Sequence, residues 1–199
     1  MNHAIGLALA AALAALAALA PSTAGAQARA LDHAKSRIAF TYTLEKKFAV
    51  QGAFRGFTAQ VAVDEAKPEA ASVRLEIDLL SIDTGSTDAD TEVKRPLWFD
   101  TASHPKAAFA SSAIRKLGEN RYEAAGKLTI KGKASDAVVP FTTAPAPGGG
   151  LVAQGRLVIK RLDFGVGTGL WADPNEISNE VEVRFTLALG PAKPAAKGK

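Results

Sequence analysis

The residue types that most often carry catalysis or hold metals are few in this chain and do not fall at catalytic spacings. Beyond the apolar N-terminal segment the histidines are His33 and His104, and the 199 residues include no cysteine. A transition-metal site needs several imidazole, thiolate or carboxylate ligands close together, and no His-x-x-x-His or Glu-x-x-His pair occurs. The sequence therefore predicts no metal site, no cofactor and no catalytic residues, and we expect a protein that is not an enzyme.

Two motifs resemble catalytic loops until their neighbours are considered. The run Gly165–Gly169 has the glycine content of a phosphate-binding loop, but a dinucleotide fingerprint needs glycine where Leu170 stands and a helix directly afterwards. Pro174 disfavours that helix. Ser103–Lys106 matches the Ser-x-x-Lys motif, whose two side chains must lie on adjacent turns of one helix. Pro105 opposes a helix there, so we interpret the first run as an irregular loop and the second as a chance match.

Three carboxylates within Asp88–Glu92 are spaced like calcium ligands. A calcium-binding loop requires glycine at its sixth position, and Val93 stands there. Carboxylates are also favourable in the first turn of a helix, where they interact with the helix dipole. We therefore predict a short helix over Asp88–Arg95, stopped by Pro96, inside a long polar connection from residue 83 to residue 105.

Aromatic residues are the remaining candidates for a functional role, and two interpretations of them stay open. The candidate set is Phe40, Tyr42, Phe54, Phe57, Trp98, Phe99, Phe109, Phe164 and Trp171. Aromatic side chains dominate ordinary hydrophobic cores, so the set could simply fill the interior of the fold. Trp98 and Phe99, however, stand in a polar connection, which favours a lid over the mouth of a ligand cavity.

Alternation of apolar and polar residues, which is typical of half-buried β-strands, runs through most of the chain. The predicted strands cover residues 37–44, 50–63, 73–79, 107–113, 122–130, 138–143, 151–160 and 181–189. Gly52 and Gly56 are expected to bend the second strand, Gly118–Asn120 to form a hairpin turn, and Ala144–Gly150 to be a flexible loop. Residues 162–177 are expected to be irregular, because glycines and a proline interrupt them.

About eight strands with one helical connection predict an all-β fold, a closed or nearly closed antiparallel β-barrel. Closure removes the exposed strand edges that would otherwise invite aggregation. A barrel of this size is either filled by side chains or holds one small ligand, and the residues leave that choice open. A net charge of +4 without a dense basic patch argues against nucleic-acid binding.

The chain divides into a leader, one domain and a tail. Ile5–Ala20 is apolar and Ala24–Ala26 has the small-x-small pattern of a signal-peptidase site, which predicts a signal peptide over residues 1–26 and export. A retained membrane anchor is the competing interpretation, although the run is short of the ~20 residues that a span needs. The barrel domain is expected over 27–190, and 191–199, with nothing to bury, is expected to be a disordered basic tail.

Short segments between Asp32 and Leu189 carry a resemblance to a known family. They are Ser36–Phe40, Val50–Phe54, Ser81–Gly85, Trp98–Asp100, His104–Pro105, Phe109–Ser111, Gly126–Gly132 and Arg161–Gly167. In this order, behind a signal peptide, they resemble the YceI-like family of periplasmic proteins, which have a lipocalin-like β-barrel and bind polyisoprenoid or other long-chain lipids.

The resemblance implies a periplasmic carrier or sequestering protein for one long apolar lipid, such as an isoprenoid quinone, a polyprenyl chain or a fatty-acid-like chain. The aromatic set then supplies ligand contacts, and Arg161 and Asp163, with Arg55 and Lys131, are candidate contacts for a polar head group. Transient membrane contact is expected, and the oligomeric state stays open, a homodimer included. Two alternatives remain: an enzyme or stress-response factor acting on a small lipid-like substrate, and an interaction module with a filled barrel.

Overall fold

A computed structural model describes residues 26–64 and 67–193 of the chain. The predicted signal peptide, residues 1–26, lies outside the described residues except for Ala26, and so does the predicted tail from residue 194 onward. Pro191 and Ala192 belong to a strand, and the amide of Lys193 donates to the carbonyl of Ala28. The stretch expected to be a tail therefore begins inside the sheet, which corrects the predicted boundary at residue 191.

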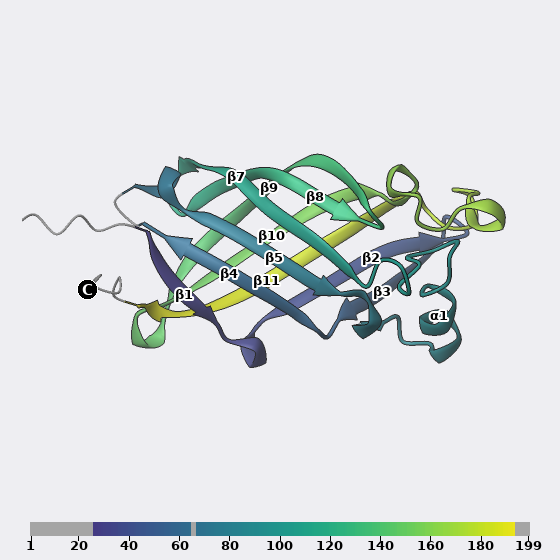
Figure 1. The fold of residues 1–199 in the computed structure, drawn as a ribbon, viewed down its shortest axis with the longest axis horizontal. Helices are drawn as coiled ribbons and strands as arrows, with labels where there is room; N and C mark the ends of the chain where they lie inside the picture. Colours follow the sequence, from purple (N-terminus) through teal and green to yellow (C-terminus); the bar gives the residue numbers. More distant parts are fainter. Residues whose placement is uncertain (1–25, 65–66, 194–199) are drawn as a thin grey trace, which may run out of the picture.

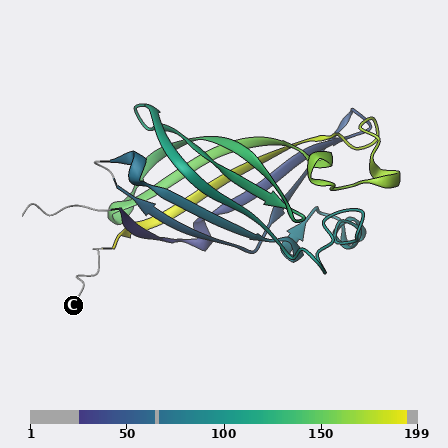
Figure 2. The same cartoon turned by 45° about the horizontal axis from the view of Figure 1, so that its top comes forward.

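Eleven β-strands among the described residues form one antiparallel sheet that closes into a barrel (Figures 1 and 2). They are β1 (Gln27–Leu31), β2 (Arg37–Leu44), β3 (Phe48–Phe54), β4 (Phe57–Val63), β5 (Ser72–Asp78), β6 (Ile82–Asp83), β7 (Lys106–Gly118), β8 (Arg121–Ile130), β9 (Lys133–Ala146), β10 (Gly150–Lys160) and β11 (Glu180–Ala192). The sheet order is β1-β4-β5-β7-β8-β9-β10-β11-β2-β3-β6, and β11 also pairs with β1, which closes the ring.

Three of these strands continue others, so the barrel is eight-stranded. β2 follows β1 after the short turn η1 (His33–Lys35), β4 follows β3 after Arg55–Gly56, and β6 follows β5 after η3 (Leu79–Ser81). The long strand β11 pairs with β2 along Glu182–Thr186 and with β1 along Leu189–Ala192, so β1 and β2 act as one bent strand. The predicted antiparallel barrel of about eight strands is confirmed.

The two glycines expected to bend the second predicted strand have different roles. Gly56 lies in the break between β3 and β4, as predicted. Gly52 instead stays in register opposite Phe40, and a Cβ atom at Gly52 would lie 2.2 Å from Cζ of Phe40. Glycine is required at position 52 because the aromatic ring packs over its backbone, and the strand does not bend there.

Alternation separates the inner face of each strand from its outer face. β10 and β11 pair in register along their length, and Leu157 and Val183 form one of the cross-strand pairs that face the interior. On the outer face of the same two strands, Nη1 of Arg156 lies 3.7 Å from Oε2 of Glu182. The most tightly packed interior residues include Ile38 and Leu79, each 1% exposed. Apolar side chains therefore gather inside the barrel and charged ones cover it.

The connections between strands divide between the two ends of the barrel. The remaining short elements are α1 (Thr87–Glu92), η2 (Pro68–Ala70), η4 (Pro147–Gly149), η5 (Arg161–Phe164) and η6 (Gly169–Trp171). We call one end the α1 end, because α1 lies there with the β2–β3 turn and the connection 161–179 (Figure 1). We call the opposite end the terminal end, because Gln27 and Lys193 lie there with η2 and η4.

The predicted helix is present but ends earlier than expected. α1 begins after Ser86, whose hydroxyl accepts a hydrogen bond from the amide of Ala89. It ends at Glu92 instead of Arg95. Pro96 has no amide hydrogen and disfavours a helical conformation at the residue before it, so the chain leaves the helix one turn sooner.

Several loop boundaries also differ from the prediction. The expected flexible loop Ala144–Gly150 is mostly the end of β9 and the tight turn η4, in which Gly148 and Gly149 have φ of +69° and +75°. The hairpin turn before β8 is confirmed, with Asn120 in a left-handed conformation. β7 and β9 are both longer than predicted, because their solvent-facing ends carry polar residues that weaken the alternation. The irregular connection after β10 is confirmed.

Candidate functional site

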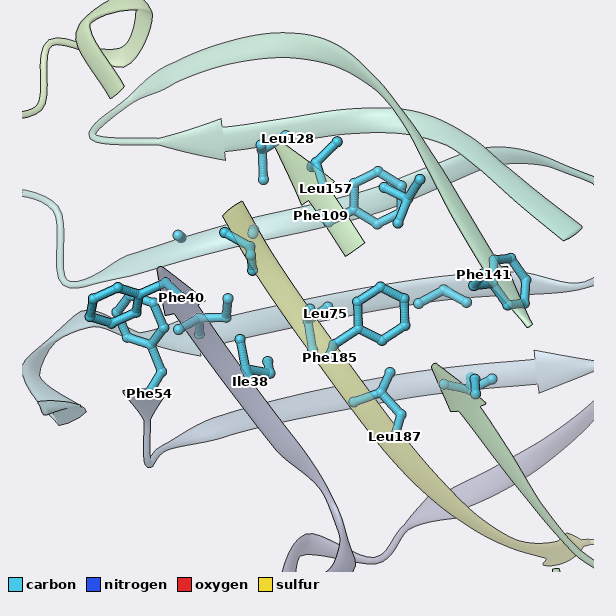
Figure 3. Close-up of a pocket in the computed structure, with 18 of the residues that line it drawn as sticks. Ile38, Phe40, Phe54, Leu75, Phe109, Leu128, Phe141, Leu157, Phe185 and Leu187 are labelled. Atoms are coloured by element: carbon cyan, nitrogen blue, oxygen red, sulfur yellow. The ribbon is translucent and has the colours of Figure 1, made fainter. Parts of the chain in front are cut away.

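The barrel surrounds a cavity of about 680 Å³ (Figure 3). All eleven strands contribute to its wall, and nearly all of the wall residues are aliphatic or aromatic. Leu75, Leu157, Val183 and Phe185 line the cavity from the middle of their strands, yet each is only half-buried, because the hollow lies in front of it. Of the two interiors that the sequence left open, filled or hollow, the structure has the hollow one.

The hollow follows from the size of the barrel and from small residues on its inner wall. An interior surrounded by eight strands is wide enough for one small ligand when side chains do not fill it. Ala107 and Ala153 face the cavity from β7 and β10. Gly155 makes room for the ring of Phe185, since a Cβ atom at Gly155 would lie 2.6 Å from that ring. The small side chains of Ala107 and Ala153 therefore leave space in the interior, whereas the space at Gly155 is taken by the Phe185 ring.

Aromatic residues close the cavity at the α1 end. Trp98 and Phe164 are buried and line the cavity together with the half-buried Phe99. The ring of Trp98 packs against that of Trp171, with centroids 5.8 Å apart, and Phe99 meets Phe54 edge-on at 6.4 Å. The polar connection that carries Trp98 and Phe99 therefore places both at the end wall of the cavity, where a lid would sit.

A buried arginine, Arg161, lies beside this aromatic wall and is 3% exposed. Its five N–H groups donate to five backbone carbonyls: Nε to Ser178 (3.0 Å), Nη1 to Val166 (3.0 Å) and Gly167 (2.5 Å), and Nη2 to Trp171 and Ile177 (2.8 Å each). Its Cζ atom lies 5.6 Å from the Trp98 ring centre, within the range of a cation–π contact. Burial lowers the pKa of the Arg161 guanidinium from its ordinary value, although an arginine stays protonated in proteins. The side chain holds the connection 161–179 together and has no donor left over for a ligand.

The glycine run Gly165–Gly169 shapes the backbone around Arg161. Gly167 has φ of +69°, and a Cβ atom there would lie 2.3 Å from Nη1 of Arg161 and 3.0 Å from the Trp98 ring. Glycine is the residue that combines a left-handed backbone with so close an approach. The run forms part of an irregular connection, as predicted.

Polar residues mark the terminal end of the cavity. Arg29 and Asp64 line the cavity there and are 7% and 5% exposed. Nη1 of Arg29 donates to the carbonyls of Gly149 (3.0 Å) and Gly190 (3.1 Å), which joins β1 to η4 and β11. Asn120 lines the same end and is exposed, so the cavity reaches the surface between these turns. Neither charged residue was among the predicted site residues. Arg29 lies on β1, which is too short to show a clear alternation, and Asp64 directly follows β4.

Eight of the eleven predicted site residues line the cavity. They are Phe40, Tyr42, Phe54, Trp98, Phe99, Phe109, Phe164 and Arg161. Phe40 and Phe54 lie side by side on β2 and β3, with ring centroids 5.3 Å apart (Figure 3). The structure therefore brings residues from separate parts of the sequence onto one wall.

The other three predicted residues do not line the cavity. Phe57 is buried beside it, with its ring 5.8 Å from that of His33. Trp171 stands behind Trp98, and its Nε1 donates to Oε1 of Glu92 (3.2 Å). Asp163 is exposed on the outside of the barrel. Phe57 and Trp171 support the wall from behind, and Asp163 is not among the residues that line the cavity.

The two further head-group candidates also lie elsewhere. Arg55 is exposed and forms an ion pair with Asp83, with Nη2 2.6 Å from Oδ2. Lys131 donates from Nζ to the carbonyls of Pro96 (2.6 Å) and Gly165 (2.8 Å). Burial lowers the pKa of Lys131 from its ordinary value. Arg55 therefore stabilises the outer surface, and Lys131 ties two connections together at the α1 end.

Much of the cavity wall was not among the predicted site residues, and most of the missed part is aliphatic. The missed residues include Ile38, Leu75, Ile77, Tyr122, Leu128, Phe141, Leu157, Val183, Phe185 and Leu187. Tyr122 and Phe141 stack with ring centroids 5.4 Å apart toward the terminal end. The signal was present, since most of these residues occupy the inward positions of strands that the alternation predicts.

Two aromatic residues of the wall carry a polar group on the ring, the phenol of Tyr42 and the indole N–H of Trp98. Burial raises the pKa of the Tyr42 phenol above its ordinary value, so this group stays neutral at physiological pH. Nε1 of Trp98 is buried and has no hydrogen-bond acceptor within the part of the chain that the structure describes. This N–H group is itself buried within the end wall and does not face the cavity space.

Residues 26–64 and 67–193 contain no group of three or more His, Cys, Asp or Glu side chains placed to hold a metal ion. No helix in the same ranges is long and apolar enough to cross a membrane.

An eight-stranded antiparallel barrel around one apolar cavity places the protein in the class of small β-barrels with an internal ligand-sized space. The chain matches the YceI-like domain over residues 30–189. It belongs to the YceI-like family.

Similar sequences come from several bacteria. Protein YceI of Escherichia coli O6:H1 is 27% identical over 139 residues, which cover 66% of this chain and 71% of the relative. A UPF0312 protein of Azotobacter vinelandii is 27% identical over 137 residues, with the same coverage of 66% and 71%. A UPF0312 protein of Pseudomonas syringae pv. tomato is 29% identical over 122 residues, which cover 59% of this chain and 64% of the relative. The match thus spans less than two thirds of the last of these relatives.

Solved structures share the fold. BcnA of Burkholderia cenocepacia is 40% identical, with a TM-score of 0.76 over 79% of this chain and 98% of that one. A polyisoprenoid binding domain from Saccharophagus degradans is 20% identical, with a TM-score of 0.65 over 83% of this chain and 99% of that one. At such low identity the second likeness is one of fold.

Proposed function

We propose that the protein binds one long apolar lipid in the barrel cavity and, after export to the periplasm, acts as its carrier or sequestering protein. The cavity carries this proposal: its volume of about 680 Å³ is typical of a small-molecule site, and its wall is almost wholly apolar. A polar metabolite would give up its hydrogen bonds to water there, whereas a hydrocarbon chain gives up none. The polyisoprenoid binding domain that shares the fold supports an isoprenoid chain as the ligand.

The volume of the cavity sets the length of chain that it holds. If each non-hydrogen atom takes the ~30 Å³ of a water molecule in the liquid, about 680 Å³ holds on the order of 20 such atoms. This corresponds to about four isoprene units. Each buried methylene contributes about 0.8 kcal/mol relative to water, so one unit contributes up to about 4 kcal/mol. Transfer of the lipid from water into the cavity is therefore strongly favourable. The protein must instead compete for the lipid with a bilayer, which it reaches by transient membrane contact, and this competition decides whether the lipid is bound.

Contacts at the α1 end favour a ligand whose polar end is small and neutral. The five N–H groups of Arg161 are all taken by backbone carbonyls, so none remains to bind a phosphate. Nε1 of Trp98 is buried within the same wall and does not face the cavity space. An uncharged hydroxyl or carbonyl end therefore fits this wall better than a phosphate, which needs several donors or a free cation.

We propose binding without catalysis. The charged side chains that line the cavity stand at its two ends, Arg161 at one and Arg29 with Asp64 at the other. A catalytic site would place an acid or base with a shifted pKa beside the bound molecule. The middle of the wall, which would contact that molecule, is instead aliphatic and aromatic.

Equilibrium binding of tritiated geranylgeraniol, in competition with phosphatidylcholine vesicles, tests the proposal. We expect saturable binding of one molecule per barrel and at least tenfold weaker binding of geranylgeranyl phosphate. Geraniol, with half the chain length, should bind far more weakly, because fewer methylenes are buried. Absence of saturable binding of geranylgeraniol would contradict the lipid-binding proposal. Equal or tighter binding of the phosphate would contradict the neutral polar end.

A further inference from the structure

The barrel wall has a seam between two neighbouring strands. β9 and β10 pair in register from the terminal end as far as Gly155↔Phe141, where the pairing stops. Residues 133–140 of β9 and 156–160 of β10, all of them described, form no pairs with each other. We call this part of the wall the β9–β10 seam. On either side of it, β9 remains paired with β8 and β10 with β11, so two intact strand pairs border the seam.

Pro140 explains why the pairing stops where it does. The amide of Thr143 donates to the carbonyl of Asn120 beside β8, so the odd-numbered amides of β9 point toward β8 and position 140 points toward β10. Proline has no amide hydrogen and cannot donate across that gap. The carbonyl oxygen of Pro140 also lies 2.5 Å from where a Cβ atom of Gly155 would be. The two strands are therefore still close together at Gly155, which belongs to the last pair of the ladder.

The seam leads directly into the cavity and is closed by apolar side chains. Val139, Leu157 and Ile159 line the cavity from the two sides of the seam, and Val139 and Leu157 belong to one packed cluster. On the outer surface Val138 and Val158 are each 53% exposed. At the seam, apolar side chains therefore cover both the inner and the outer face of the barrel wall.

Both ends of the cavity are lined by buried charged groups, unlike the seam, although the cavity also reaches the surface beside Asn120 at the terminal end. At the α1 end, the five hydrogen bonds of Arg161 hold the connection 161–179 in place. At the terminal end, Arg29 bonds to the carbonyls of Gly149 and Gly190. A hydrocarbon chain that passed either end would have to move past buried charged groups. Parting the seam separates apolar side chains along most of its length, and the hydrogen bond from Nζ of Lys133 to the carbonyl of Asp163 (3.4 Å) lies at its α1 end.

We propose that the β9–β10 seam is the gate through which the apolar chain of the ligand passes between the cavity and its surroundings, an inference that rests on the proposed lipid-binding function. The resting cavity holds on the order of 20 non-hydrogen atoms, so longer chains also require the wall to widen. The unpaired segments 133–140 and 156–160 supply that widening, because no pairing between β9 and β10 has to break when these segments move apart.

A reversible crosslink across the seam tests the gate. The chain has no cysteine, so the double variant Val138→Cys/Val158→Cys offers two thiols in a clean background. Continuing the register of the paired region would place these two positions opposite each other. The protein is first loaded with dansyl-labelled geranylgeraniol, then joined with a short bis-methanethiosulfonate, and release into excess phosphatidylcholine vesicles is followed. Energy transfer from Trp98 and Trp171, the two tryptophans of the chain, reports the bound probe.

We expect the crosslink to slow release at least tenfold and a reductant to restore the original rate. The matched control is Thr142→Cys/Gln154→Cys, a pair on the same two strands that faces outward where the ladder is intact. Its crosslink should change the release rate by less than twofold. Unchanged release from the crosslinked Val138→Cys/Val158→Cys protein would overturn the gate and assign passage to the terminal end. Failure of the wild-type protein to load the probe would instead overturn the proposed function.

A second variant tests the gate without a crosslink. Pro140→Val restores an amide hydrogen that points toward β10 and lets the ladder extend across the seam. We expect slower release of the same probe by several-fold, with equilibrium binding retained. Release from Pro140→Val as fast as from the wild type, in a protein whose amide exchange shows the extended ladder, would contradict the gate.

Discussion

Filling the cavity with protein side chains should abolish lipid binding without destabilising the fold. The double variant Leu75→Trp/Leu157→Trp places two indoles in the hollow from β5 and β10 (Figure 3). Ordinary core residues respond to enlargement by losing about 1–3 kcal/mol of stability each, because well-packed neighbours have no room to give. Leu75 and Leu157 are only half-buried and face empty space, so the expected effect on stability has the opposite sign.

The size of the effect follows from the volume of the cavity. Each Leu-to-Trp change adds about six non-hydrogen atoms, which at ~30 Å³ each fill about 180 Å³. Two such changes fill about 360 Å³ of the cavity volume of about 680 Å³ and leave room for roughly ten atoms. A chain of four isoprene units would then leave about half its carbons unburied, at about 0.8 kcal/mol each. Affinity for geranylgeraniol should fall at least 100-fold, while the melting temperature stays the same or rises.

The assay pairs vesicle-competed binding of tritiated geranylgeraniol with thermal denaturation followed by circular dichroism. Arg74→Trp/Gln154→Trp is the control, since these residues lie on the same two strands and are exposed on the outer face. The control should bind as the wild type does. Wild-type affinity in Leu75→Trp/Leu157→Trp would show that the lipid does not occupy the cavity. A fall of 10 °C or more, equivalent to about 3 kcal/mol in a domain of this size, would show that the interior is already packed.

Three further predictions concern the frame around the cavity. Arg161→Lys should lower the unfolding free energy by about 3 kcal/mol or more, because one ammonium group cannot satisfy five carbonyls; a loss below about 1 kcal/mol in urea titration would contradict the role of this network. Gly167→Ala should lower the unfolding free energy more than Gly148→Ala in the same titration. Both glycines have φ of +69°, but a Cβ atom at Gly167 would meet Arg161, whereas one at Gly148 would meet nothing within 4 Å. Equal losses of unfolding free energy would refute the close-approach argument. The hydrogen bond from Arg55 holds the pKa of the Asp83 carboxyl below its ordinary value, so the stability that this pair adds is present above pH ~4 and is lost as the pH falls through the lowered pKa. The melting temperatures of the wild type and Arg55→Gln should therefore converge in acid, and a gap that widened below pH 4 would reverse the assigned sign.

The alternation of side chains predicted most of the fold because it reports which face of a strand is buried. The run from Ile38 to Leu44 and the run from Val181 to Leu189 became inner faces of β2 and β11, as expected. The same alternation could not decide between a filled and a hollow barrel, since it says nothing of the distance between opposite walls. That distance depends on barrel closure and on small residues such as Ala153, which long-range pairing brings into place.

The candidate site was predicted in part, and residue type explains the rest. Aromatic residues were chosen for their size, yet Phe57 and Trp171 pack behind the wall while the aliphatic Leu75 and Leu157 form it. Arg161 was chosen for its charge, but its N–H groups donate to backbone carbonyls of the connection 161–179. No local sequence pattern predicts the path of that connection. The seam left a visible trace in the sequence: a proline inside a strand indicates an edge.

The central claim is that the cavity holds one apolar lipid in the protein as it is made in its own cells. Native mass spectrometry of the protein, purified gently from those cells without detergent, tests it most directly. We expect a one-to-one complex whose mass excess is that of a neutral lipid with a chain of about 20 carbons or more, and which is absent from Leu75→Trp/Leu157→Trp purified in the same way. A wild-type spectrum with the ligand-free mass alone, or an adduct retained in full by the filled variant, would contradict it.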